Sequence, residues 1–99
     1  MDESLAVKFL GALAQEHRLR IYRRLVVAGL QGETPGLLGE ALALPAATLS
    51  FHLKELVHAG LVTQERSGRN LIYRADLSCM NRLIQFLTEN CCGGLPCGC

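Results

Sequence analysis

Residues 46–74 read AATLSFHLKELVHAGLVTQERSGRNLIYR, and this stretch decides the fold. Apolar residues at helical spacing predict a helix from Ala46 to Ala59, which Gly60 ends as a C-terminal cap. Two β-prone runs follow, Leu61–Arg66 and Asn70–Arg74, and the turn between them has a glycine at its centre. Such a turn between strand-forming runs is typical of a hairpin. The stretch therefore predicts a helix that is followed at once by a β-hairpin.

Three more helices are expected before this stretch. The first covers Leu5–Leu13, with acidic and polar residues before it as caps, and the second covers Glu16–Ala28. The third covers residues 34–42, because Pro35 suits the first position of a helix. The short connection from this helix to Ala46 gives the two helices the dimensions of a helix-turn-helix. A hairpin placed directly after the second of these helices is a wing.

A last helix is expected over about Leu77–Asn90, and after it the character of the chain changes. Residues 91–99 read CCGGLPCGC and hold all but one of the five cysteines. The glycines and the proline of this tail leave too little apolar material for a packed element. We therefore predict a mainly α fold with a small β-hairpin, a winged helix-turn-helix with the order α-α-α-α-β-β-α. Residues 1–90 form its domain and residues 91–99 form a cysteine-rich tail.

Length and composition exclude several classes of protein. A chain of 99 residues, 49% apolar and 19% charged, makes one small folded domain rather than two cores or a disordered chain. No apolar run is long enough for a transmembrane helix, and the acidic start Met1–Ser4 is unlike a secretory signal. We therefore expect a cytoplasmic protein, in which cysteines bind metals or react more often than they form structural disulfides. The net charge of +1 argues neither for nor against nucleic acid, so a local basic patch has to support binding.

The expected outward face of the 46–59 helix carries small and hydrogen-bonding side chains. They are Ala47, Thr48, Ser50, Phe51 and His52. A helix that enters the major groove of DNA needs such residues, since Ser, Thr and His can bond to phosphates or to base edges. The same side chains are equally consistent with an ordinary helix surface. The helix alone therefore does not decide the function.

The tip of the predicted hairpin is basic. Arg66 and Arg69 flank Ser67-Gly68, and Arg74 closes the second strand. Arginines at such a tip can contact phosphates or enter the minor groove, although they are also common on solvated surfaces. The combination of two turn-linked helices, a face that fits a groove and a basic wing favours DNA binding. No pair of a nucleophile with a base, and no pair of carboxylates, indicates an enzyme.

Three stretches resemble the ArsR/SmtB family of metal-responsive repressors, and they are Leu13–Ile21, Ala47–Val62 and Glu65–Arg74. They are similar to the second helix, the recognition helix and the wing of that family, so the resemblance covers about residues 5–90. It implies a homodimer that binds double-stranded operator DNA and leaves it when an effector binds. We expect the dimer interface on the first and last helices, where the apolar surface exceeds what a small monomer can cover. The residues concerned are Leu5, Phe9, Leu83, Ile84, Phe86 and Leu87.

Members of this family sense effectors at sites in different places, and two of those sites are missing here. Leu37–Glu40, at the start of the third helix, has no cysteine, and the last helix has no histidine. The tail remains, and its thiolates are soft ligands that select thiophilic ions. Adjacent side chains diverge on a continuous helix, whereas the backbone of a vicinal pair where the helix ends can turn both sulfurs inward. Some arsenic-responsive members carry such a pair with a third cysteine a few residues on. The resemblance thus implies that trivalent arsenic or antimony binds Cys91, Cys92 and either Cys97 or Cys99.

Other uses of the tail stay open. Its four cysteines can hold a tetrahedral zinc or cadmium ion, form a redox-sensitive disulfide, or belong to a disordered end. A metal chaperone or buffer is the alternative of a different class, although it has no need of a groove-binding helix and a wing. Cys79 is expected to be a small buried residue rather than a ligand. The histidines His17, His52 and His58 have no ligand spacing, and we expect them at the surface or at caps.

Overall fold

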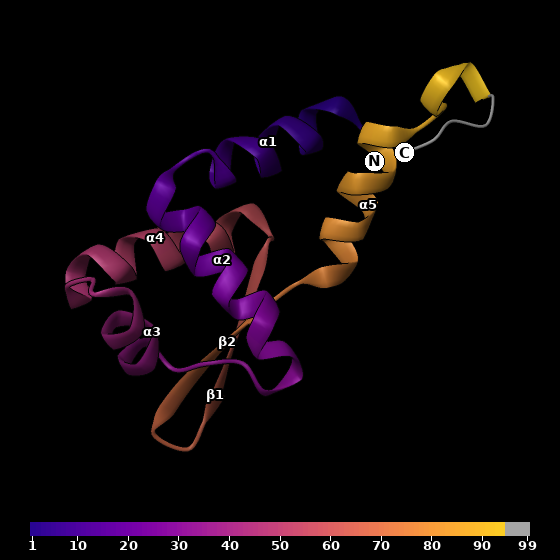
Figure 1. Ribbon diagram of the computed structural model, residues 1–99. Helices are drawn as coiled ribbons and strands as arrows, with labels where there is room; N and C mark the ends of the chain where they lie inside the picture. Colours follow the sequence, from indigo (N-terminus) through magenta and orange to yellow (C-terminus); the bar gives the residue numbers. More distant parts are fainter. Residues whose placement is uncertain (95–99) are drawn as a thin grey trace.

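A helix-turn-helix followed by a hairpin forms the centre of the computed structural model, which describes residues 1–94 (Figure 1). The order of the elements confirms the predicted winged helix-turn-helix, and α2 and α4 have the predicted bounds. The helices are α1 (Glu3–Leu13), α2 (Glu16–Ala28), α3 (Pro35–Leu42), α4 (Ala46–Ala59) and α5 (Leu77–Thr88). The strands are β1 (Val62–Ser67) and β2 (Asn70–Ala75), and the short 3-10 turns are η1 (Gly29–Gln31) and η2 (Cys91–Gly94).

Short polar side chains fix where three of the helices begin. Asp2 Oδ1 accepts a hydrogen bond from the Leu5 backbone N–H at 2.7 Å, which confirms the predicted cap of α1. Asp76 Oδ1 accepts one from the Cys79 N–H at 3.2 Å and starts α5. Thr34 caps α3 in the same way. Each cap satisfies an N–H group that would otherwise lack a partner in the first turn.

Apolar side chains of α2, α4 and the start of β1 form the centre of the core. Ile21 and Leu25 of α2, Leu53 and Leu56 of α4, and Leu61 before β1 are fully buried. Burying these side chains removes a large apolar area from water, which is the main stabilising contribution in a domain of this size. Because α4 packs one face into this core, its opposite face is left to solvent.

The α3–α4 pair has helix-turn-helix geometry. The two helices meet at 114°, within the range of this motif. In the part of the chain that the structure describes, no single helix is long and apolar enough to cross a membrane. Within residues 1–94, α3 and α4 are long and apolar enough for a membrane span by length and composition only when the two are counted together, and they are bent against each other.

The wing is a two-stranded antiparallel hairpin. Its register runs from Val62 opposite Ala75 at the base to Ser67 opposite Asn70 at the tip. Gly68 in the tip has a φ of +63°, a conformation that glycine adopts without strain. The glycine that marked the hairpin in the sequence therefore makes the turn.

The base of the wing is attached to the segment before α3. The Glu33 N–H donates to Tyr73 O at 3.0 Å, and the Tyr73 N–H donates to Glu33 O at 2.9 Å. Gly32 permits this approach, because it has φ +66° and ψ −169°, a region that only glycine adopts readily. A Cβ atom at Gly32 would lie 2.6 Å from Tyr73 O. Two pieces of backbone thus meet where there is no room for a side chain.

α1 and α5 lie at the end of the molecule opposite the tip of the wing (Figure 1). Five large apolar side chains of these two helices are exposed, and these are Val7, Leu10, Leu77, Ile84 and Leu87. Ile84 and Leu87 were expected on a surface, whereas the other three were not.

The prediction that Phe9 and Leu83 belong to an exposed dimer interface is wrong. Both belong to the core of the single chain, where they are 4% and 2% exposed. Phe9 takes the inner face of α1 together with Ala6, which turns other apolar residues of the helix outward. Leu5 and Phe86 are half-buried against the same core. Only part of the predicted face is therefore available to another molecule.

Candidate nucleic-acid interface and cysteine pair

α4 presents a small surface of polar and aromatic side chains next to the wing. Ala47, Ser50 and Phe51 are exposed, Phe51 at 54%, and Thr48 is half-buried. Leu49 between them is buried and anchors the helix. The exposed side of the N-terminal half of α4 therefore offers the hydroxyl group of Ser50 and the ring of Phe51 to solvent.

The predicted outward placement of His52 is wrong. The side chain is 7% exposed, and its Nδ1 accepts a hydrogen bond from Arg18 Nε at 3.2 Å. His52 lies one residue before Leu53, about 100° around the helix, and this side of α4 faces α2 rather than solvent. Burial, followed by repulsion from Arg18 and His17, lowers the pKa of His52, and Glu55 acts in the opposite direction. The imidazole is therefore neutral at pH 7 and belongs to the contact between α2 and α4.

Arg18 is a residue of this surface that the sequence pattern did not single out. It lies in the first turn of α2, and its guanidinium carbon is 5.6 Å from the centre of the Phe51 ring. The helical pattern shows it only as one of several arginines around the rim of α2. Its contact with α4 distinguishes it, and no pattern within one helix could reveal that contact.

The arginines of the hairpin divide into two groups. Arg66 and Arg69 are exposed near the tip, as expected, and neither forms a salt bridge within residues 1–94. Arg74 instead donates from Nε to Leu30 O at 2.7 Å and from Nη1 to Glu65 at 2.9 Å. Arg74 therefore braces the base of the wing, while the tip keeps two positive charges for a polyanion.

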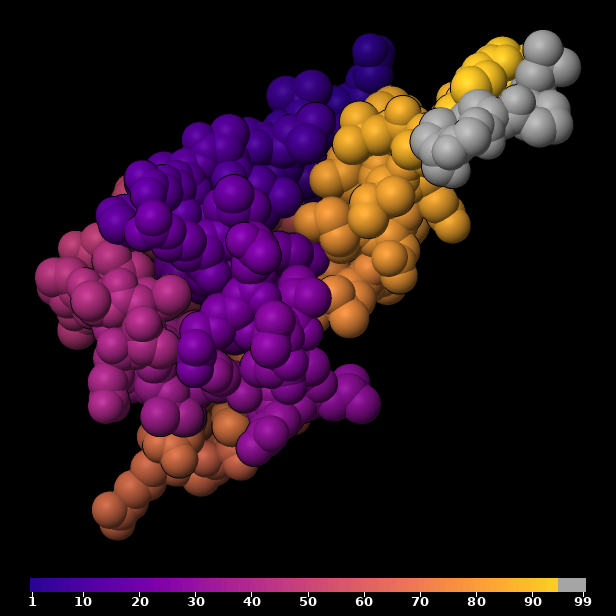
Figure 2. All heavy atoms as spheres, in the orientation of Figure 1, coloured from indigo at the N-terminus to yellow at the C-terminus, as the bar shows by residue number. Residues whose placement is uncertain are grey.

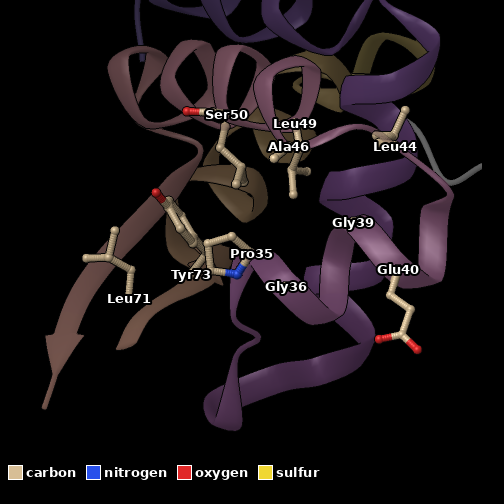
Figure 3. A pocket seen from close by; sticks show the side chains of 11 residues that line it. Pro35, Gly36, Gly39, Glu40, Leu44, Ala46, Leu49, Ser50, Leu71 and Tyr73 are labelled. Atoms are coloured by element: carbon tan, nitrogen blue, oxygen red, sulfur yellow. The ribbon is translucent and has the colours of Figure 1, made fainter. Parts of the chain in front are cut away.

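A hollow of about 360 Å³ lies between α3, α4 and β2, beside the exposed face of α4 (Figure 3). Its lining is mainly apolar, and Gly36 and Gly39 of α3 contribute no side chain that could fill it. Ser50 lines this hollow and also a second one of about 220 Å³ toward Gln64 of β1. Ser50 is therefore not packed against the wing, and its hydroxyl group remains accessible.

Ser50→Ala is expected to weaken binding to a specific DNA duplex by about 1–3 kcal/mol, the usual contribution of a residue that contacts a base. The fold should not change, because the position is exposed and alanine favours helix. Fluorescence anisotropy with a duplex that the wild-type protein selects from a randomised pool, and with a scrambled duplex as control, measures the effect. Equal affinity of variant and wild type for the selected duplex would move base recognition away from Ser50.

Arg69→Ala is expected to reduce the salt dependence of DNA binding as well as the affinity. Each lost phosphate contact lowers the slope of log K against log salt by about 0.9. Arg20→Ala is the matched control, because it removes the same charge from α2, where Arg20 pairs with Glu16 at 2.6 Å. A slope that stays at the wild-type value for Arg69→Ala would show that the wing tip does not touch DNA.

Cys91 and Cys92 lie just beyond α5, in the turn η2. Their Sγ atoms are 3.7 Å apart, and both residues are exposed. This separation is far longer than the roughly 2.05 Å of a disulfide bond. α5 ends at Thr88, and Asn90 and Cys92 each have a φ of +57°. The break in the helix lets the two sulfurs lie close together, but both residues are exposed, so the expected inward turn of the sulfurs is not seen.

Cys79 is a packed residue, as predicted. It is buried, and its Sγ atom lies 3.3 Å from the backbone oxygens of Gly60 and of Asp76. Burial and then the charge of Asp76 raise the pKa of the Cys79 thiol. A thiol with a raised pKa is a poor nucleophile and a poor metal ligand at neutral pH.

No other ligand completes the cysteine pair in the part of the chain that is described. Within residues 1–94, no three His, Cys, Asp or Glu side chains are placed to hold a metal ion. The rings of His17 and His52 lie tilted against each other with centres 5.5 Å apart, but they are not part of such a group. Cys97 and Cys99, the other two predicted ligands, lie outside the described residues.

Known proteins are similar to this chain in fold and in the sequence of its helix-turn-helix region. A family model for a helix-turn-helix domain matches residues 13–65, more than half of the chain. An ArsR-like transcriptional regulator from Rhodococcus sp. RHA1 has a TM-score of 0.77 and 26% identity over 87% of this chain and 78% of its own. HlyU from Vibrio cholerae N16961 has a TM-score of 0.72 and 30% identity over 93% of this chain and 99% of its own. The chain belongs to the helix-turn-helix family of ArsR-type transcriptional regulators.

This ArsR-type regulator is also similar to a solved structure described as a possible transcriptional regulator for arsenical resistance. The TM-score is 0.69, with 28% identity over 83% of this chain and 82% of the other. A comparison with curated proteins finds no match. Relatives of this regulator are DNA-binding proteins rather than enzymes. The matched residues 13–65 include α2, α3, α4 and part of the wing but not the tail, so the family alone does not identify the effector.

Proposed function

We propose that this regulator is a dimeric repressor that leaves its operator when trivalent arsenic or antimony binds its C-terminal cysteines. The Cys91–Cys92 pair supports this proposal, because its two exposed sulfurs lie 3.7 Å apart directly after the last helix. Thiolates are soft ligands and favour thiophilic ions over hard ones such as magnesium or calcium. A site with only sulfur ligands therefore suits a metalloid that enters a reducing cytosol.

The spacing of the two sulfurs fits a single bound ion. Two thiolates at about 2.3 Å from one ion, at an angle near or slightly below tetrahedral, lie about 3.5–3.8 Å apart. The observed 3.7 Å falls in this range. Further ligands would be Cys97 or Cys99 for a metalloid that takes three sulfurs, and both for a tetrahedral zinc or cadmium ion. The spacing of the pair suits both cases, so the number of ligands decides between them.

A second copy of the chain would cover the exposed apolar faces of α1 and α5. Val7 and Leu10 on α1, and Ile84 and Leu87 on α5, are exposed apolar side chains. Both helices lie at the end of the molecule away from the tip of the wing (Figure 1). Exposed apolar patches of this kind mark association surfaces. A dimer formed there keeps both copies of α4 free for DNA.

The position of the cysteines links the ion to this interface. η2 follows α5 after only two residues, so a change at the pair acts on the end of an interface helix. A shift in how two protomers meet alters the distance between the two copies of α4. Operator half-sites lie about one turn of DNA apart, roughly 34 Å, and a dimer with another spacing does not fit them.

A mobility-shift titration tests the proposal. The full chain, kept reduced, is bound to the selected duplex and titrated in parallel with arsenite, antimonite, zinc and cadmium. We expect arsenite and antimonite to release the DNA at concentrations at which zinc and cadmium leave the complex intact. Release by zinc or cadmium alone would assign the tail to a tetrahedral ion, and no release by any of the four would remove the tail from effector sensing.

A further inference from the structure

We propose that Arg18 of α2 binds a DNA phosphate beside α4, and that His52 and Phe51 hold its guanidinium group in position for this contact. The inference needs DNA binding through α4 but not the sensing of a metalloid. It adds a contact from a third element to the surface formed by α4 and the wing.

Two contacts from α4 fix the guanidinium group. Arg18 Nε donates a hydrogen bond to His52 Nδ1 at 3.2 Å, and the guanidinium carbon lies 5.6 Å from the centre of the Phe51 ring. The first contact sets the direction of the Nε–H bond, and the second adds a cation–π attraction. Two partners on one helix leave the side chain of Arg18 little freedom, which lowers the entropy cost of binding an anion.

The contact lies at the border between the core and the DNA-facing surface. His52 is 7% exposed, whereas its neighbour Phe51 is 54% exposed. The guanidinium group between them is therefore half-buried at its Nε end and lies next to the outward face of α4. In helix-turn-helix proteins, residues beside the recognition helix contact the phosphates at the edges of the groove that this helix enters.

The outer end of the guanidinium group keeps its donors. Within residues 1–94, no hydrogen bond or salt bridge engages the Nη atoms of Arg18. By contrast, Arg20 pairs with Glu16 at 2.6 Å and Arg24 pairs with Glu33 at 2.8 Å. A guanidinium fork with both Nη groups available matches two oxygens of one phosphate.

His52 can play its part only in the neutral form, with Nδ1 as the acceptor. Protonation would turn Nδ1 into a donor and place a second positive charge beside Arg18. Burial and the neighbouring charges of Arg18 and His17 lower the pKa of His52, against the opposing effect of Glu55. His52 is therefore a positioning residue that is kept neutral by the arginine it holds and by its own burial.

Arg18→Gln separates the phosphate contact from the link between α2 and α4. The amide nitrogen of glutamine occupies the place of Nε, so it can still donate to His52, but the positive charge is gone. Arg20→Gln is the matched control, because it removes the same charge from the next but one residue of α2. DNA binding is measured by anisotropy with the selected duplex over a series of salt concentrations, without any metalloid.

We expect Arg18→Gln to bind the duplex about tenfold or more weakly, as for the loss of a charged hydrogen bond. The slope of log K against log salt should fall by about 0.9 for each protomer bound. The midpoint of unfolding of Arg18→Gln should stay at the wild-type value. Arg20→Gln should keep the wild-type DNA affinity and salt slope. If Arg18→Gln keeps the wild-type salt slope, Arg18 only links the two helices and does not contact DNA. If both variants lose the same affinity, Arg18 acts only through the overall charge of the protein. Either result overturns the proposal.

A second measurement uses the wild-type protein and needs no substitution. Arginines are labelled with phenylglyoxal with and without the duplex, and the labelled positions are found by mass spectrometry. DNA should protect Arg18 and leave Arg20 unprotected, and equal labelling of Arg18 in both samples would contradict the contact. Failure of the sensing proposal looks different, because wild-type protein would then stay on DNA in the presence of arsenite.

Discussion

Serine in place of Cys91 or Cys92 is expected to leave the protein on its operator at arsenite concentrations that release the wild type. A serine hydroxyl group stays protonated and is a hard ligand, so it cannot replace a thiolate. The two sulfurs lie 3.7 Å apart and would share one ion, so the loss of either removes the chelate. The affinity for arsenite should fall by more than about 10–100-fold. That is the usual loss when a residue that only hydrogen-bonds to a metal ligand is removed.

The same variants should bind the operator normally when no metalloid is present. Neither cysteine belongs to α3, α4 or the wing, so the DNA-binding surface is unchanged. Cys79→Ser is the matched control, since this buried thiol is bonded to backbone oxygens, and it should respond to arsenite like the wild type. Full release of a Cys91→Ser, Cys92→Ser double variant by arsenite would place the sensing site elsewhere.

Gly32→Ala is expected to lower the free energy of unfolding by about 2–6 kcal/mol. The φ and ψ of Gly32, +66° and −169°, cost a residue with a side chain about 1–3 kcal/mol. The added Cβ would also lie 2.6 Å from Tyr73 O and 2.7 Å from Ile72 Cγ2. Overpacking of this kind adds about 1–3 kcal/mol. The backbone cannot simply withdraw, because Glu33 is bonded to Tyr73 at both its N–H and its carbonyl group. Urea denaturation followed by circular dichroism measures the change.

Gly36→Ala provides the control for this substitution. Its Cβ would meet no heavy atom within 4 Å, and the residue lies in α3. Alanine there should leave stability unchanged or raise it by up to about 1 kcal/mol, because it restricts the unfolded chain. If Gly32→Ala unfolds at the same urea concentration as the wild type, the base of the wing does not depend on the close approach of backbone at Gly32.

The helices and the hairpin could be predicted because their determinants are local. Asp2 caps α1, Gly60 ends α4 and Gly68 turns the hairpin, and each of these effects depends on a few neighbouring residues. Apolar residues at helical spacing identify which residues form a helix. They do not identify which of them face the chain's own core, and for this reason Phe9 and Leu83 were expected on a surface.

The candidate site shows the same division. The closeness of the Cys91 and Cys92 sulfurs follows from adjacent residues at a helix end, so the sequence indicated it. The contact between Arg18 and His52 joins residues that are 34 positions apart, and it exists only because α2 crosses α4. A polar residue at the edge of a buried stripe can face solvent or a neighbouring helix, and the position of that helix decides. The prediction that His52 faces outward was therefore wrong, because the packing of α2 against α4 buries it and the helical pattern of α4 alone does not show this.

The turn η2, which contains the cysteine pair, and the tip of the wing lie at opposite ends of the molecule, with the core between them (Figure 2). Mutations can therefore change one of these two ends without disturbing the other. Under the proposed function, gain, loss or exchange of cysteines after Thr88 would alter the effector, while the regulated genes would stay the same. Changes on the outer side of α4 would then alter the regulated genes and keep the effector. A gene duplication followed by drift at one end only would give two regulators that share either a stimulus or a target.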